Sequence, residues 1–220
     1  MEQRTALVVG ATGLIGQFLV KKLEQQPEYK KIYLFVRRDM EVVSEKTEVR
    51  VVSFDLLEEK DFPQVDDVYC CLGTTIKKAK TKEAFKQVDY EYPLKIARAA
   101  LKKGAKQFLV VSAIGANETS RFFYSRVKGE VEKAVMNLAY AHIHIFRPSL
   151  LLGKRQEVRI GEKIGEWGAK LAKPWLRGPF AKYRAISGEQ VAQVMVARAL
   201  TKTDQPVLIY ESNEMNSALK

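Results

Sequence analysis

Apolar residues in this chain fall into short runs of strand length that alternate with longer segments of helical periodicity. The predicted strands cover residues 6–9, 31–36, 49–54, 65–72, 107–112 and 142–146. The predicted helices cover residues 14–26, 81–103 and 124–139, where apolar side chains recur three or four positions apart. Strands that alternate with helices predict an α/β fold built on a doubly wound parallel sheet.

The chain beyond residue 150 is less regular. Residues 161–172 have helical spacing, and residues 207–210 can form a last strand. Ser187 followed by Gln190 is typical of a capping box at the start of a helix. The large aromatic side chains of this part, which suit a lid or a subunit contact, are Trp167, Trp175 and Phe180.

Length and composition predict one domain. The chain has 220 residues, of which 46% are apolar, and it shows neither a linker nor a repeat. We therefore expect residues 1–220 to form a single domain in which residues 150–220 make up a small substrate-side portion. Its apolar runs fall short of the roughly 20 residues of a membrane span, so no membrane partner is expected.

The two cysteines and the start of the chain bear on the compartment. Cys70 and Cys71 are adjacent, so on a strand they point to opposite faces and suit neither a structural disulfide nor a metal site. The chain also starts directly into a strand, without the pattern of a secretory signal. A reducing, cytoplasmic location is the resulting expectation.

The formal net charge of +11 raises the question of nucleic-acid binding. The densest basic clusters, at residues 77–80 and 102–103, lack interleaved aromatic side chains. We therefore expect a solvated basic surface rather than a nucleic-acid site, with part of the charge serving the phosphates of a cofactor.

Glycines at the first strand-to-helix turn are the most informative motif. Gly10, Gly13 and Gly16 follow the first strand and open the first predicted helix. In such a turn the first glycine permits a tight bend, the second lets the backbone approach a pyrophosphate, and the third lets the helix pack closely. The free N–H groups at the helix start then favour the anion. This predicts a dinucleotide site.

Two further strand ends bear on which dinucleotide is bound. An acidic residue after the second strand would hold the ribose of NAD, but Arg37 and Arg38 stand there instead. A guanidinium matches a phosphate, so the pair favours NADP, with two plain surface arginines as the alternative. Asp55, after the third strand, suits either the adenine amino group or a helix cap.

Ser112, Tyr124 and Lys128 form the candidate catalytic set. Ser112 ends the fifth predicted strand, while Tyr124 and Lys128 lie four residues apart, on one face of the following helix. A neighbouring ammonium favours the phenolate and makes a tyrosine usable as an acid–base group. The set suits hydride transfer between a nicotinamide and a carbonyl–alcohol pair, with Ser112 holding the carbonyl.

Two histidines on one face of the sixth strand, His142 and His144, raise the question of a metal site. A third ligand is not evident in the sequence, so we expect a structural role for them and no metal.

Several segments together resemble the short-chain dehydrogenases/reductases of the atypical, extended-like kind, and more closely their Tat-interacting-protein-like branch. The matching segments are residues 10–16, Ser112, residues 124–128 and residues 147–149, with residues 70–75 and 127–132 typical of the branch. The similarity runs from about residue 4 to about residue 200.

The resemblance implies a Rossmann-type doubly wound sheet with a short C-terminal substrate-side extension, and a bound NADP(H). The residues it implies for the cofactor are Gly10, Thr12, Gly13, Leu14, Ile15, Arg37, Arg38, Asp55, Leu56, Leu72, Gly73, Thr74, Lys128, Pro148 and Leu151. The family's active-site asparagine is replaced here near Asp89.

Two functions stay open at this point. The first is an NADPH-dependent reductase of a small carbonyl compound. The second is a regulator that binds NADPH with little turnover, as described for some members of this branch. A protein partner or a homodimer is compatible with both.

Overall fold

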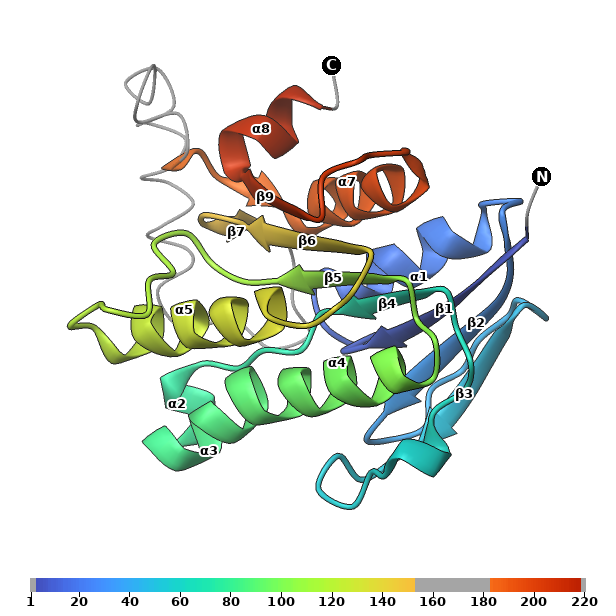
Figure 1. The fold of residues 1–220 in the computed structure, drawn as a ribbon, viewed down its shortest axis with the longest axis horizontal. Coiled ribbons are helices and arrows are strands. Elements are labelled where there is room, and N and C mark those ends of the chain that lie inside the picture. The colour runs from blue at the N-terminus through green and yellow to red at the C-terminus, as the bar shows by residue number, and fades with distance from the viewer. Residues whose placement is uncertain (1–2, 153–182, 219–220) are drawn as a thin grey trace.

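A seven-stranded, fully parallel sheet forms the centre of the computed structural model, which describes residues 3–152 and 183–218 (Figure 1). The strand order is β3-β2-β1-β4-β5-β6-β9. The strands are β1 (Arg4–Val9), β2 (Tyr29–Val36), β3 (Thr47–Val51), β4 (Asp67–Cys70), β5 (Gln107–Val111), β6 (His142–Arg147) and β9 (Val207–Glu211). The order reverses between β1 and β4, which is where such sheets bind ligands. The predicted fold class is confirmed.

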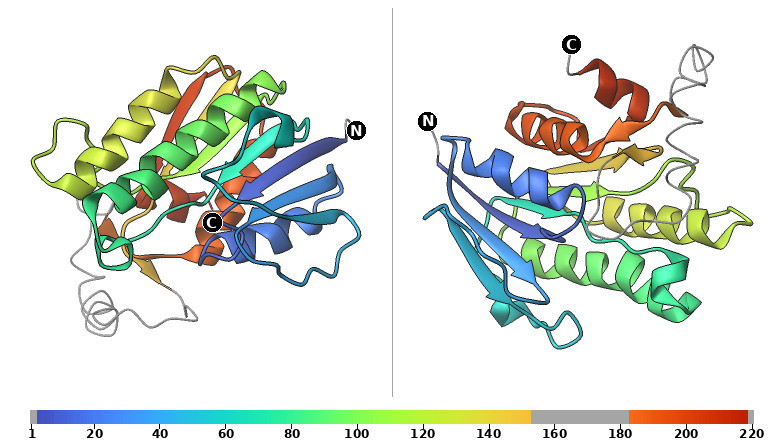
Figure 2. Two further views of the ribbon diagram at one scale, coloured as in Figure 1. Left: turned by 90° about the horizontal axis from the view of Figure 1, so that it is seen from below. Right: turned by 180° about the vertical axis from the view of Figure 1, so that it is seen from behind.

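Two helix layers cover the sheet (Figure 2). One layer holds α1 (Gly16–Glu24) and α7 (Gly188–Leu200), and the other holds α4 (Tyr92–Lys102) and α5 (Phe123–Met136). The shorter elements are η1 (Glu59–Asp61), α2 (Ile76–Ala79), α3 (Lys82–Lys86), η2 (Gln87–Glu91), β7 (Leu151–Leu152), β8 (Ile186–Ser187) and α8 (Ser212–Ser217).

The strands bury both faces, and alternate residues enter different halves of the core. In β1, Ala6 and Val8 pack under α1 and α7, while Leu7 and Val9 pack under α4 and α5. Cys70 and Cys71 likewise belong to opposite halves, as predicted. Burial raises the pKa of the Cys70 thiol to about 12, so that thiol is protonated and unreactive at neutral pH.

The helix predicted over residues 81–103 is divided. α3 is followed by η2, a single π-helical stretch, and then by α4, whose first turn contains Pro93. Among the apolar residues that recur every four positions in this segment, Ile96 and Ala100 are buried, whereas Val88 and Tyr92 are only partly buried. Asp89, between Val88 and Tyr92, is 1% exposed. The Asp89 carboxylate can be buried here because it pairs with Lys128 and accepts a hydrogen bond from the Thr74 backbone N–H.

Residues beyond 182 contribute to the main sheet rather than only to its substrate side. β9 extends the sheet beside β6, and α7 packs against α1. Ser187 and Gln190 form the predicted capping box, with N–H to oxygen distances of 3.0 and 3.1 Å. Helix α8 was not anticipated. The predicted helix 161–172 lies outside the described residues, as do the three large aromatics, Trp167, Trp175 and Phe180.

Within the described ranges, no helix combines the length and apolarity needed to cross a bilayer. In the same part of the chain, His, Cys, Asp and Glu side chains form no group of three or more that could hold a metal.

His144 gives the fold a predictable pH dependence. Its ring is buried and stacks on Tyr210 with centroids 5.9 Å apart, and burial, reinforced by His142 and Arg198, lowers its pKa from 6.5 to about 4. Below pH 6.5 the unfolded chain therefore binds a proton that the folded chain does not. Stability falls as the pH drops from 6.5 toward 4, by about 2 kcal/mol near pH 5.

In denaturant titrations, the stability of His144→Phe should not show this fall between pH 6.5 and 4, because phenylalanine keeps the stack on Tyr210 and cannot titrate. The control is His142→Phe, at a partly buried histidine of the same strand. It should keep most of the fall, because burial, the main cause of the lowered pKa of His144, is unchanged. An equally steep loss of stability in wild type and His144→Phe would contradict this assignment.

Candidate functional site

The glycine turn between β1 and α1 is closed by backbone contacts. Gly10 has φ of +80°, and a Cβ on it would lie 2.6 Å from the carbonyl carbon of Cys71. A Cβ on Gly16 would lie 2.1 Å from the carbonyl oxygen of Gly10. Both positions therefore require glycine, and the turn is folded tightly beside the end of β4.

This turn fits a phosphate group. Thr12 is exposed and Gly13 is half-buried, so backbone is accessible at the turn. Leu14 and Ile15 have buried side chains, so only their backbone can reach a ligand. α1 starts at Gly16, two residues later than predicted, so its first N–H groups directly follow the glycine turn.

A cavity of about 660 Å³ lies at the carboxyl ends of β2, β3 and β4. Its lining residues are Arg37, Val51, Val52, Ser53, Phe54, Asp55, Thr74, Lys78, Ala79, Ala84, Gln87, Val88 and Tyr92. Arg37 is part of the lining, whereas the exposed Arg38 is not. Leu56 is 78% exposed and also lies outside it. The strand-end residues predicted for the cofactor are thus only partly brought together.

Asp55 is held in the wall of this cavity. Its Oδ1 accepts hydrogen bonds from Gln87 Nε2 and from the Tyr92 hydroxyl, each at 2.7 Å. Burial and this carboxylate raise the pKa of Tyr92 to about 12, so its hydroxyl stays a donor. Glu58, not Asp55, caps η1, so the cap interpretation of Asp55 does not hold for that helix.

Lys128 is buried and paired with a carboxylate. Its Nζ lies 2.7 Å from Asp89 Oδ1, with side-chain exposures of 6% and 0%. Asp89 Oδ2 accepts the Thr74 backbone N–H at 2.8 Å, which ties the end of β4 to η2 and α5. Although burial opposes charge, the Asp89 carboxylate and Tyr124 raise the pKa of Lys128, so the ammonium is retained.

Ser112 directly follows β5, and Tyr124 lies in the first turn of α5, four residues before Lys128. The Ser112 N–H donates to the Phe146 carbonyl at 2.7 Å, and its Oγ is buried with no hydrogen-bond partner among the described residues. Tyr124 is half-buried, with its ring 5.6 Å from that of Phe85, and it interacts electrostatically with Lys128. An unpartnered buried hydroxyl is rare and suits a ligand oxygen.

The segment after β6 is fixed from several sides. Pro148 is buried, and its carbonyl accepts the Ile114 N–H at 3.0 Å. Arg147 forms a bidentate pair with the buried Glu132 of α5. Leu151 lies in β7 and packs against the core. Pro148 is therefore placed beside the chain that leaves Ser112.

Asp89 is the residue whose role the sequence did not reveal. In the sequence, Asp89 stands out only as a departure from a family pattern. Its spacing of four from the buried Phe85 on one side and from Pro93 on the other would have placed it on the core side of the helix. A carboxylate on a core-facing stripe is a signal for a buried partner.

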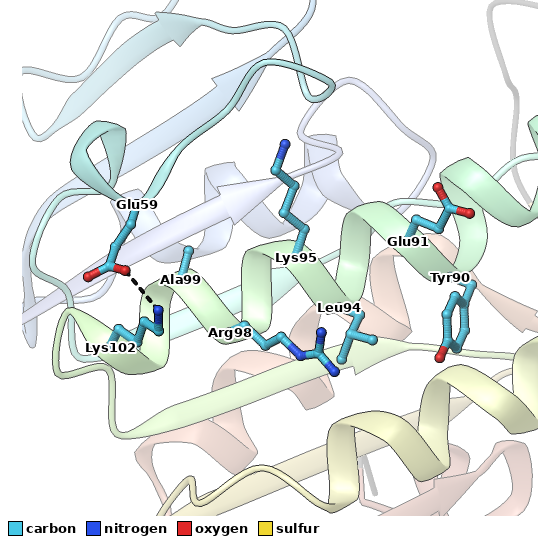
Figure 3. A pocket seen from close by; sticks show the side chains of 8 residues that line it. All are labelled: Glu59, Tyr90, Glu91, Leu94, Lys95, Arg98, Ala99 and Lys102. Carbon is cyan, nitrogen blue, oxygen red and sulfur yellow. Dashed lines mark hydrogen bonds and ion pairs between the residues drawn. The ribbon is translucent and has the colours of Figure 1, made fainter.

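Figure 3 shows a second cavity, of about 470 Å³, along α4. Its side chains come from α4, η1 and η2, and the ion pair between Glu59 and Lys102, at 3.1 Å, lies at one end. The residues predicted for cofactor or substrate take no part in its lining.

The parallel sheet, the glycine turn after β1 and the cavity at the carboxyl ends of β2, β3 and β4 define a dinucleotide-binding protein of the Rossmann class. A family model described as NAD(P)H-binding matches residues 10–202, and the chain belongs to this family.

Relatives and solved structures agree with this assignment. The chain is 36% identical to Protein HTATIP2 of Rattus norvegicus, over 91% of this chain and 81% of the relative. It is 34% identical to Protein FMP52, mitochondrial, of Eremothecium gossypii, over 98% and 97%. The oxidoreductase ylbE from Lactococcus lactis matches with a TM-score of 0.68 at 17% identity, over 98% of this chain and 96% of that one. MoeE5 in complex with UDP-glucose and NAD matches with a TM-score of 0.71 at 15% identity, over 97% and 80%.

The expectation of a cytoplasmic protein is contradicted. Relatives at 31 to 34% identity over most of the chain bear the name Protein FMP52, mitochondrial. The physical reason for the error is that free thiols indicate a reducing environment without distinguishing among the compartments that provide one.

Proposed function

We propose that this protein is an NADP(H)-dependent oxidoreductase that reduces a small carbonyl compound. The observation that carries the proposal is the Ser112 hydroxyl at the carboxyl end of β5, which is buried and has no hydrogen-bond partner among the described residues. The electrostatic interaction between Tyr124 and the buried Lys128 supports the same proposal. Membership of the NAD(P)H-binding family supports the cofactor class.

Each residue of this set has a distinct task. A nicotinamide bound at this site would supply or accept the hydride. Ser112 donates a hydrogen bond to the substrate carbonyl and holds it next to Tyr124, which gives the proton as the alcohol forms. Lys128 holds positive charge beside the phenol and would hold the ribose of a bound nicotinamide nucleotide. Pro148 and Leu151 would line the nicotinamide end of that site.

Arg37 is the basis for proposing NADP rather than NAD as the cofactor. Its guanidinium lines the cavity at the end of β2, and Lys78 lines the same cavity from α2. A second phosphate on the adenosine ribose would meet positive charge from two elements there, which NAD cannot exploit.

Replacing Arg37 by alanine tests this choice. We expect Arg37→Ala to weaken NADPH binding about 10- to 100-fold, the worth of a hydrogen-bonded charge pair, and NADH binding less than about twofold. Arg38→Ala is the matched control, since Arg38 lies outside the cavity lining, and it should change either affinity only slightly. Equal losses for NADPH and NADH in a titration of Arg37→Ala would remove the argument for NADP.

A cofactor-binding regulator is the second candidate. The observation in its favour is the Asp89–Lys128 ion pair, which offsets the positive charge that would otherwise act on Tyr124. NADPH absorbance, followed with a panel of small aldehydes and ketones, separates the two. Consumption above background supports the reductase, and bound but unconsumed NADPH supports the regulator. A protein that binds no nucleotide contradicts both.

A further inference from the structure

We propose that Asp89 is a positioning residue that biases the site toward the oxidised form of the nicotinamide cofactor. The inference rests on the proposed function, because it needs a nicotinamide near Lys128. It goes further by assigning a task to a buried carboxylate that the proposed reaction does not use.

Asp89 is held in place by two elements. One oxygen meets Lys128 Nζ at 2.7 Å, and the other accepts the Thr74 N–H at 2.8 Å. The side chain is fully buried and comes from η2, the π-helical stretch between α3 and α4. The carboxylate is therefore fixed in position and joins the end of β4 to α5.

Gly73 lies next to this ion pair. A Cβ built on Gly73 would lie 3.4 Å from Asp89 Oδ1 and 3.7 Å from Lys128 Nζ. Gly73 is exposed, so the pair lies directly behind the accessible surface at the end of β4. A ligand that passes over Gly73 comes close to both charges.

In the described part of the chain, two titratable groups besides Asp89 interact with Lys128. Tyr124 faces Lys128 from α5, and Cys70 faces it from β4 with a thiol whose pKa burial raises to about 12. At neutral pH the formal charges of this group are therefore Lys128 and Asp89, one positive and one negative. Removing the negative one leaves a net positive site.

The oxidised nicotinamide ring carries a positive charge that the reduced ring lacks. A nearby carboxylate therefore favours NADP⁺ relative to NADPH, while an uncompensated ammonium does the reverse. Tighter binding of the oxidised form shifts the bound couple toward NADP⁺, so bound NADPH becomes the better hydride donor. Asp89 would in this way support carbonyl reduction without contacting the substrate.

Titration of Asp89→Asn with NADP⁺ and with NADPH tests the proposal. We expect the ratio of the dissociation constants, NADP⁺ over NADPH, to rise about tenfold relative to wild type. Asp89→Glu restores the charge and should recover much of the wild-type ratio. Lys128→Gln removes the positive partner and should move the ratio in the opposite direction, which keeps the test available if Asp89→Asn does not fold.

Asp67→Asn is the matched control. Asp67 is likewise fully buried and paired with a basic residue, Arg4 in place of a lysine, but it lies at the start of β4, at the opposite edge of the sheet. This variant should lose stability and keep the wild-type ratio. An unchanged ratio in both Asp89→Asn and Lys128→Gln, with both nucleotides still bound, would overturn the inference and leave the proposed function intact. If the wild type bound neither NADP⁺ nor NADPH, the proposed function itself would be overturned.

Discussion

Tyr124→Phe is expected to lower kcat/KM for carbonyl reduction by about 10²- to 10⁴-fold, the usual contribution of a positioned acid–base group. The ring would stay packed against Phe85, 5.6 Å away, so only the proton donor is removed. Affinity for NADPH should stay within a few-fold of the wild type. Steady-state kinetics with the best substrate of the carbonyl panel, together with an NADPH titration, give both numbers.

The matched control is Tyr90→Phe. Tyr90 lines the second cavity, along α4, and its ring lies 5.4 Å from Lys86 Nζ. The variant therefore removes a tyrosine hydroxyl that the proposed reaction does not use. This variant should keep wild-type rates. Undiminished turnover in Tyr124→Phe would remove Tyr124 from the reaction.

Gly129→Ala is expected to lower both turnover and stability. At Gly129, helix α5 is in close contact with the connection that runs from Ser112 to α5. A Cβ on Gly129 would lie 2.1 Å from the Glu118 backbone nitrogen and 2.2 Å from the Asn117 carbonyl carbon. Such contacts are impossible, so the connection between β5 and α5 must move away from the helix.

The size of the effect follows from what that connection joins. It runs from Ser112 to Tyr124, and the Asn117 N–H donates to the Ser125 carbonyl at 3.0 Å. A displacement of about 1 Å between reacting groups lowers rates about 10²-fold, and the overpacking itself costs about 1–3 kcal/mol. Thermal unfolding and kcat/KM measure the two losses.

Gly115→Ala supplies the comparison within the same connection. A Cβ there meets nothing within 4 Å, and its φ of +76° adds only the strain of a left-handed residue, about 1–2 kcal/mol. It should therefore lose some stability and keep most of its turnover. If Gly129→Ala behaved like Gly115→Ala, the contact would not control the spacing of the site.

Local sequence was sufficient for the fold because its signals are short in range. Apolar runs and their alternation placed the strands, and the glycines at positions 10, 13 and 16 marked the turn at the end of β1. The Ser187–Gln190 capping box could also be predicted from the sequence, since it depends on two residues three positions apart.

The site depended on contacts between distant segments. Arg37 and Arg38 are equivalent in sequence, yet only Arg37 lines the cavity, because successive side chains at the end of a strand point in different directions. Asp55 could cap a helix or face a ligand, and Gln87 and Tyr92, more than thirty residues later, turn it into the cavity wall.

The sequence by itself determined the doubly wound sheet, its glycine turn and the candidate set of Ser112, Tyr124 and Lys128, because periodicity and motif spacing are properties of neighbouring residues. Only the tertiary structure decided that Lys128 is paired with Asp89 and that Thr74 binds the same carboxylate. The physical reason is that burial excludes water from an ion pair formed between η2 and α5, and that burial exists only once the helices have packed on the sheet.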